Sequence, residues 1–246
     1  MSDRFRALDL ASLAGSIPDK YLILKNKIER LLSAHSIRTD LEIALDMLLS
    51  LEIAQVQAEH SIQAGQARSW QSDAALALLN SAIILYVRAT RTSSKHRRNF
   101  DFKSEFTDKQ KVVHEKLCDL RNDAIAHYGP GRLDDGQSWH VEAVCIPLDN
   151  PEDLRIMTGS RRLFKQAPLQ DMAKRQIHRA LLLSDKFTQK CNADVVDEMN
   201  ELCNDKEFVE LTLDHHTNLA DFFTSEEEAE RALDVRVGRV TGTVNH

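Results

Sequence analysis

The stretch Thr107–Pro130, TDKQKVVHEKLCDLRNDAIAHYGP, decides the architecture that we expect for this chain of 246 residues. Thr107 and Gln110 form a capping-box pattern, in which each side chain bonds the backbone N–H of the other residue at the start of a helix. Apolar residues then recur with helical spacing, at Val113, Leu117, Leu120, Ala124 and Ile125. The Gly-Pro pair after Tyr128 cannot continue the helix, so we predict that one long helix ends there.

Four more segments show helical periodicity. Helices are predicted over 19–36, from Thr39 to about Ala64, from Ser69 or Ser72 to Arg88, and from Pro168 to about Cys203. The break before Thr39 rests on a second capping-box pattern, with Glu42 three residues later. The chain has only 8 Gly and 5 Pro, which favours long helices over a turn-rich sheet. The expected fold class is therefore mainly α.

Two segments between the predicted helices have the period of strands. Ser138–Pro147 (SWHVEAVCIP) and Leu154–Lys165 (LRIMTGSRRLFK) are rich in β-branched and aromatic residues, with an Asn-Pro turn signal between them. We predict a β-hairpin inserted at about 138–166. Its Arg161 and Arg162 either extend a basic surface or take part in a dimer contact.

The C-terminal part of the chain is acidic. Ala193–Asp234 carries a net charge of −12, against −6 for the whole chain. Within it Ser225 and Glu228 predict the start of a short helix, and the terminal VRVGRVTGTV alternates weakly like an edge strand. We therefore expect a helical domain over 17–204 and an acidic C-terminal extension over 205–246.

Composition also bounds the class of protein. No apolar run approaches the roughly 18 residues needed to cross a bilayer, and acids interrupt the N-terminus where a signal peptide would be apolar, so we expect a cytoplasmic protein without a membrane span. The widely spaced cysteines form no CxxC pair, which predicts reduced thiols and no zinc site. They are Cys118, Cys145, Cys191 and Cys203.

A basic segment precedes the central helix. The net charge over Arg88–Lys103 is +5, which permits a local polyanion-binding face on an acidic protein. A solvated charged surface is the alternative. The candidate RNA contacts in this segment are Arg88, Arg91, Lys95, Arg97 and Arg98.

The end of the central helix carries the candidate catalytic residues, Arg121, Asn122 and His127. Arginine can hold a phosphate bidentately, and histidine can move a proton near neutral pH. The spacing alone is weak evidence, because Arg30 with His35 and Arg91 with His96 share it. His35 is expected in the core. The context of the Asn and the helix end distinguishes the central motif.

In this motif the chain resembles the HEPN superfamily, whose pattern is an Arg, a polar residue, a short spacer and a His on a late helix of a helical bundle. The resemblance implies an up-and-down bundle and a metal-independent endoribonuclease without a cofactor, acting in prokaryotic defence or a toxin–antitoxin system. It also implies a homodimer with a composite site. His127 would then be the acid or base, Arg121 the phosphate clamp, and Asn122 an orienting or RNA-contacting residue. His114, seven residues before Arg121 on nearly the same helical face, is a further candidate RNA contact.

Two alternatives stay open. The chain could be a non-catalytic helical module that binds a protein partner, with Arg121 paired to an acid such as Asp123 and His127 capping the helix. An antitoxin is the other partner that the resemblance permits. Tyr128 follows His127 directly, unlike the His-x-Tyr of antitoxin-modified HEPN toxins, so that modification is not carried over.

Overall fold

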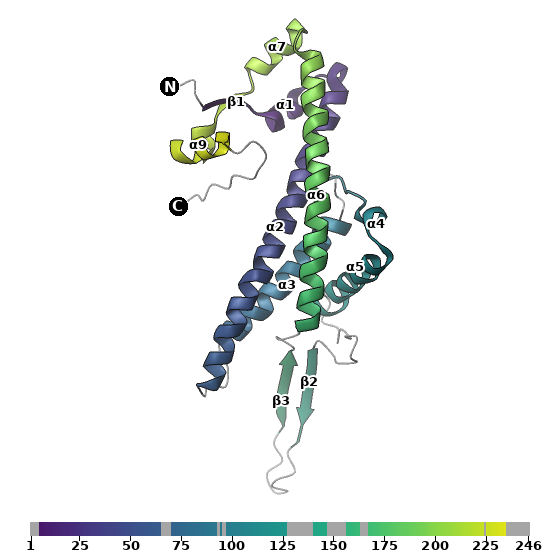
Figure 1. Cartoon of the computed structure of the whole chain (residues 1–246), viewed down its shortest axis with the longest axis vertical. Coiled ribbons are helices and arrows are strands. Elements are labelled where there is room, and N and C mark those ends of the chain that lie inside the picture. Colours follow the sequence, from purple (N-terminus) through teal and green to yellow (C-terminus); the bar gives the residue numbers. More distant parts are fainter. Residues whose placement is uncertain are drawn as a thin grey trace. The chain divides into compact units, whose positions relative to one another are not determined.

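The computed structural model describes residues 5–64, 70–92, 94, 97–126, 140–146, 156–162, 167–223 and 225–234. Its internal contacts divide the chain into two units, one formed by residues 33–188 and the other by residues 1–32 together with 189–246. The described chain is mainly α, with long packed helices and two small two-stranded sheets (Figure 1). The predicted boundary between 204 and 205 stays a prediction.

Two long helices, α2 (Leu22–Gln63) and α6 (Ala167–Leu202), run through both units and lie side by side within each (Figure 1). In the 33–188 unit, Arg38 Nε donates to Asp185 Oδ1 at 2.5 Å and Lys174 Nζ donates to Glu52 Oε1 at 2.6 Å. From the first of these contacts to the second, the residue number rises from 38 to 52 in α2 and falls from 185 to 174 in α6. The two helices are therefore antiparallel.

The predicted break before Thr39 is wrong, because α2 is one continuous helix of 42 residues. The segment contains neither Gly nor Pro, and the buried face continues through Ile37 and Leu41. Arg38 Nη2 also pairs with Glu42 Oε1 at 2.8 Å across one turn, which stabilises helix at the predicted break. The glutamate thus bonds the turn before it instead of capping a new helix.

The central helix begins as predicted. In α5 (Asp108–Leu120), Gln110 N donates to Thr107 Oγ1 at 3.4 Å and Thr107 N donates to Gln110 Oε1 at 3.0 Å. Both bonds of the capping box are present, which confirms the sequence signal. The preceding helix, α3 (Trp70–Arg91), also matches its prediction, and a short α4 (Phe102–Glu105) lies between the two.

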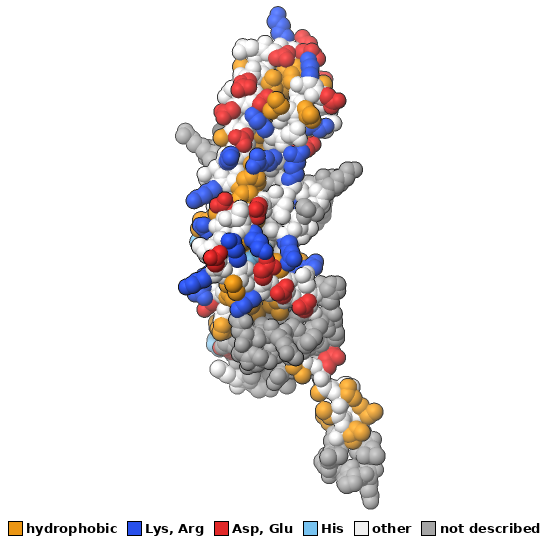
Figure 2. Space-filling view, turned by 90° about the vertical axis from the view of Figure 1, so that its right-hand side faces the viewer, with side chains coloured by type: hydrophobic (Ala, Val, Ile, Leu, Met, Phe, Trp, Pro, Cys, Tyr) orange, Lys and Arg blue, Asp and Glu red, His pale blue; other side chains and the backbone are white. Residues whose placement is uncertain are grey.

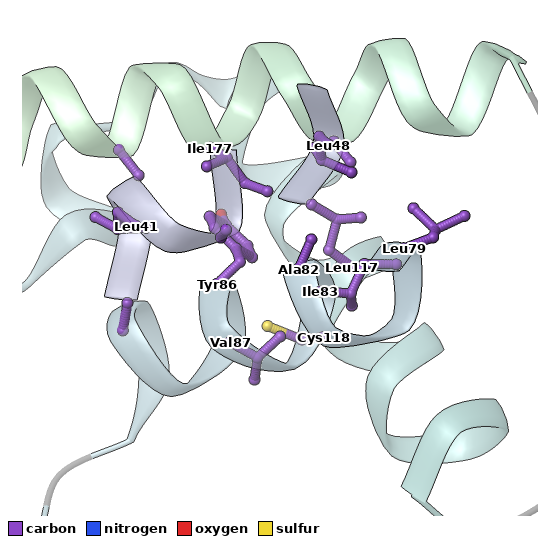
Figure 3. Packing of buried hydrophobic residues seen from close by; sticks show 14 of the residues in the cluster. Leu41, Leu48, Leu79, Ala82, Ile83, Tyr86, Val87, Leu117, Cys118 and Ile177 are labelled. Atoms are coloured by element: carbon purple, nitrogen blue, oxygen red, sulfur yellow. The ribbon is translucent and has the colours of Figure 1, made fainter. Parts of the chain in front are cut away.

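Side chains from α2, α3, α5 and α6 converge in the core of the 33–188 unit (Figure 3). Those labelled in the figure are Leu41, Leu48, Leu79, Ala82, Ile83, Tyr86, Val87, Leu117, Cys118 and Ile177. The apolar face of α2 is wider than its neighbours cover, because Leu49, Ile53 and Val56 are exposed. His35, expected in the core, is exposed as well.

Helix α3 also corrects an expectation about apolar runs. It is long and apolar enough, by length and composition, to cross a membrane. Core helices of soluble proteins meet the same criterion, and eight of its side chains are buried in the structure. The feature decides nothing about location.

The predicted hairpin is confirmed. Strand β2 (His140–Cys145) pairs antiparallel with β3 (Met157–Arg162), in a regular register that runs from His140 opposite Arg162 to Cys145 opposite Met157. The helix predicted from Pro168 follows as α6.

The unit formed by 1–32 and 189–246 joins the two ends of the chain. Strand β1 (Arg6–Leu8) pairs with β4 (His216–Asn218). The helices here are α1 (Leu10–Ser16), η2 (Asp19–Tyr21), α7 (Lys206–Leu213), α8 (Leu219–Phe223) and α9 (Glu226–Asp234). Glu228 N donates to Ser225 Oγ at 3.1 Å, which confirms the predicted start of α9. The alternating segment after Asp234 lies outside the described residues.

Candidate functional site

The helix that carries the candidate motif changes its winding where the motif begins. Directly after α5, residues Arg121–Ala126 form a π-helix, η3. The predicted helix therefore continues to Ala126, with a winding that the apolar pattern did not indicate. A π turn bonds residues five apart, which rotates the following side chains relative to the α-helical face, and such turns are frequent at functional sites. The other motif positions, His127, Tyr128, Gly129 and Pro130, lie outside the described residues.

Arg121 is partly buried and points its guanidinium at its neighbour. Arg121 Nη1 donates to Asn122 Oδ1 at 3.0 Å, and within the described residues the guanidinium has no acidic partner. Asp123, one acid that the non-catalytic alternative would pair with it, is exposed and makes no such contact. Among the described residues, the other four of the five guanidinium N–H donors have no partner and are available to an anion. The amide oxygen of Asn122 accepts from the fifth donor, and the orienting role of Asn122 stays a prediction.

His114 lies in the core, where its side chain is only 5% exposed. Its Nδ1 lies 2.9 Å from the Tyr86 hydroxyl, and its Nε2 lies 3.7 Å from Cys118 Sγ. Gln176 Nε2 donates to the same hydroxyl at 3.1 Å, so the hydroxyl proton is free to go to His114. This network joins α3, α5 and α6. His114 has no surface for the expected phosphate contact and instead anchors the helix that leads into Arg121.

Burial sets the protonation of this network. It lowers the pKa of His114 and raises the pKa values of Tyr86 and Cys118, because each charged form would lose its hydration. Glu115 opposes the shift of the His114 pKa, while Lys103 and Arg91 add to it. The imidazole is therefore neutral near pH 7, as acceptance of the Tyr86 proton requires.

His114 should make the fold sensitive to acid. An unfolded histidine has a pKa of about 6.5, so the unfolded chain gains a proton that the buried imidazole resists as the pH falls below about 6.5. This contribution to stability is complete above that pH and is lost below it. His114→Gln keeps a neutral hydrogen-bonding side chain, and urea unfolding between pH 7 and pH 5 should show a flatter loss of stability than in the wild type. Parallel pH profiles would contradict the prediction.

Two of the candidate RNA-binding arginines are held by a buried acid. Asp40 of α2 is 4% exposed, and its carboxylate accepts from Arg88 Nε at 2.8 Å and from Arg97 Nη1 at 2.6 Å. Arg88 Nη2 bonds the other carboxylate oxygen. Asp40 thus ties α2, the end of α3 and the loop after it together. The charges of Arg88 and Arg97 therefore stabilise the fold through Asp40.

The remaining predicted contacts are only partly available. Arg91 Nη1 lies 3.7 Å from Glu115 Oε2, and Lys103 Nζ lies 2.5 Å from the other oxygen of the same carboxylate. Arg98 is an exposed residue whose backbone N donates to Ser33 Oγ at 3.1 Å. Lys95 lies outside the described residues. Figure 2 likewise shows Lys and Arg interleaved with Asp and Glu over the helical part of the visible face.

The structure adds a basic stripe that the sequence analysis missed, Arg175, Arg179 and Lys186 of α6. Arg175 and Lys186 are exposed and Arg179 is half-buried, and none of the three has an acidic partner within the described residues. At about 100° per residue they lie within roughly 40° of one another around the helix, over an axial span of about 16 Å. The i, i+4, i+11 spacing was visible in the sequence, but only the structure shows that no acid of the described chain pairs with these charges.

The described residues contain no group of three His, Cys, Asp or Glu side chains suited to hold a metal ion. The thiols are unpaired, with Cys118 and Cys191 buried and Cys145 and Cys203 exposed. Comparisons with protein-family models, with curated proteins and with solved structures found no match to this chain. A functional interpretation therefore depends on the geometry and chemistry of its own residues.

Proposed function

We propose that the protein is a cytoplasmic, metal-independent endoribonuclease of HEPN type that acts in prokaryotic defence or in a toxin–antitoxin system. One observation carries the proposal: Arg121 sits at the start of a π turn, oriented by Asn122 and without an acidic partner in the described chain. A structural arginine would be expected in an ion pair, as Arg88 and Arg97 are with Asp40. The antiparallel α2 and α6, which share one core with α3 and α5, support a HEPN-like bundle.

The chemistry needs only proton transfer and charge stabilisation. The 2′-hydroxyl of RNA loses its proton and attacks the adjacent phosphorus, the bond to the 5′-oxygen breaks, and that oxygen takes up a proton. The products end in a 2′,3′-cyclic phosphate and a 5′-hydroxyl. His127 would transfer one of the protons, and the Arg121 fork would hold the two phosphate oxygens that gain charge. Pairing two copies would bring two Arg–His pairs to one composite site.

Cleavage in the presence of a chelator tests the proposal. Purified full-length protein should cut single-stranded RNA in EDTA and leave cyclic phosphate ends. Arg121→Ala and His127→Ala should each lower the rate by about 10² to 10⁴. Lys109→Ala changes an exposed cation on the same helical segment and serves as the control. If wild type and both variants show the same residual degradation of every RNA tested, the protein is not this nuclease.

RNA binding should depend more on the cations of the α6 stripe than on cations that already form an ion pair with an acid. Changing Arg175, Arg179 and Lys186 together to Ala should reduce the slope of log affinity against log salt by about 2, since each single-stranded phosphate contact contributes about 0.7. The measurement is fluorescence anisotropy with labelled RNA and a cleavage-deficient His127→Ala background.

The matched control for that prediction is Lys174, the residue directly before Arg175 in the chain. Lys174 lies on the same helix as Arg175, but its Nζ already pairs with Glu52. Lys174→Ala should leave the salt slope almost unchanged, whereas Arg175→Ala alone should reduce it by about 0.7. Equal effects of the two single variants would show that α6 attracts RNA only through its net charge.

A second candidate function is a non-catalytic module that binds a protein partner. The hairpin favours it, because hydrophobic side chains cover much of the described hairpin surface in Figure 2. An inactive protein with a defined oligomeric state would support this alternative.

A further inference from the structure

The β2–β3 hairpin has no core of its own in the described structure. Every side chain whose exposure is described in it is exposed, including Val144 at 74%, Ile156 at 72% and Met157 at 54%. Strands alternate their side chains, so Val141, Ala143 and Cys145 face one side while Val144 faces the other. Both faces are therefore partly apolar. A two-stranded hairpin is marginally stable in water, and a third strand or a packed face is needed for independent stability.

The two edges of the hairpin differ in how well they are protected. Natural edge strands discourage further pairing with charges, prolines or bulges. The β3 strand carries Arg161 and Arg162. The β2 strand, HVEAVC, begins with His140 and has a single charged residue, Glu142. The β2 strand has no proline, and its pairing with β3 is continuous without a bulge. Within the described residues no third strand covers β2. The β2 edge is therefore open to another strand.

We infer that the β2 edge pairs antiparallel with the β2 edge of a second copy of this chain. Such pairing is two-fold symmetric and closed, and it gives a four-stranded sheet ordered β3–β2–β2′–β3′. Both unprotected edges are used, and the arginine-bearing β3 strands become the outer edges. Pairing of β2 with β3 of another copy would leave a free edge at each end and propagate into a fibre. Closure makes the second copy's β2 the fitting occupant.

The charges agree with this arrangement. Each β2 brings one carboxylate, Glu142, and an antiparallel register separates the two carboxylates along the sheet unless they lie directly opposite each other. The apolar residues of β2 from both copies then lie next to each other on the two central strands of the sheet. The inference goes beyond the proposed nuclease activity, because edge pairing can occur whether or not the protein cleaves RNA. If both hold, the hairpin helps to bring two Arg121 sites into one particle.

Sedimentation of the full-length protein over a concentration series tests the inference. The wild type should be a dimer, and Val144→Lys should weaken dimerisation at least about tenfold, because it places a charge at the paired edge. The matched control is Thr158→Lys. Thr158 lies directly opposite Val144 on the same face but on β3, one strand away from the contact. A monomer at every concentration, or equal weakening by the two lysines, would overturn edge pairing.

Cysteine scanning keeps the test independent of hairpin stability. A cysteine is placed at position 141 or 143 of β2 in a background with Cys145→Ser and Cys203→Ser, and the native Cys145 is tested with Cys203→Ser alone. Each variant is oxidised; the other two thiols, Cys118 and Cys191, are buried. Antiparallel self-pairing predicts disulfide-linked dimer that peaks at one position and falls on both sides. Gly159→Cys in β3, directly opposite Ala143, has room for a side chain and should not crosslink. No crosslinking along β2, or equal crosslinking at position 159, would overturn the inference.

Discussion

Asp40→Ala should lower the free energy of unfolding of the 33–188 unit by about 3 kcal/mol, because it leaves the charges of Arg88 and Arg97 without their acceptor. Removal of one partner of a buried pair typically costs about 3–5 kcal/mol. The lower end applies here, since the Arg88 side chain is 53% exposed and can turn to water. The Arg97 side chain is 14% exposed and cannot hydrate without opening the loop. Thermal unfolding followed by circular dichroism should show Tm lowered by about 6–12 °C.

Asp185→Ala is the matched control for Asp40→Ala. Asp185 also accepts from an arginine, Arg38, but its side chain is 34% exposed, and Arg38 keeps Glu42 as a second partner. An exposed pair of this kind contributes about 0–1 kcal/mol. Equal destabilisation by the two variants would mean that Asp40 holds no buried network. In that case Arg88 and Arg97 would again be candidate RNA contacts.

Local signals in the sequence predicted the elements that form through local contacts. The capping box at Thr107 and the N-cap at Ser225 were confirmed, because each joins a side chain to a backbone N–H three residues away. The hairpin was confirmed from its period of two and its turn signal. The same logic failed at Thr39. There the apolar face and an Arg38–Glu42 pair continue the helix, and a capping pattern does not show which of the two outcomes is more stable.

Features that depend on distant residues could not be predicted from one sequence. Arg6 bonds His216 across a separation of 210 residues, and nothing local in either strand specifies the other. The ion-pair partners of the basic segment Arg88–Lys103 could not be predicted for the same reason. Its net charge was correct, but whether an arginine is free depends on an acid such as Asp40, 48 residues before Arg88 in the chain. The π turn at Arg121 was also hidden, because an apolar pattern indicates a helix without indicating its winding.

The sequence named the candidate residues of the site but could not show which groups surround them. The adjacency of Arg121 and Asn122 was visible in the sequence, and their 3.0 Å contact agrees with an orienting role for the amide. The expected supporting groups changed. His114 is buried in the core, and Arg88 and Arg97 are paired with Asp40. In the part of the chain that the structure describes, cations without an acidic partner instead lie along α6. A basic surface is thus better defined by charges without partners than by the density of Lys and Arg.

Arg121→Lys should be nearly as damaging as Arg121→Ala and lower RNA cleavage by about 100-fold. Lysine keeps the positive charge but is a flexible point donor, whereas the guanidinium offers a planar fork that matches two phosphate oxygens. Lysine would also lose the fixed geometry in which Asn122 holds one nitrogen and leaves the others free. Single-turnover cleavage with saturating protein separates this effect from weaker RNA binding.

The control for that substitution is Arg30→Lys, the same exchange at an exposed position of α2 outside the proposed site. It should leave the single-turnover rate unchanged. If Arg121→Lys retained most of the wild-type rate while Arg121→Ala lost it, charge alone would suffice at this position. Arg121 would then attract RNA without clamping the reacting phosphate, and the transition-state charge would have to be stabilised by another group. If both variants lost the rate while RNA affinity fell little, the planar fork would be established as part of the catalytic site.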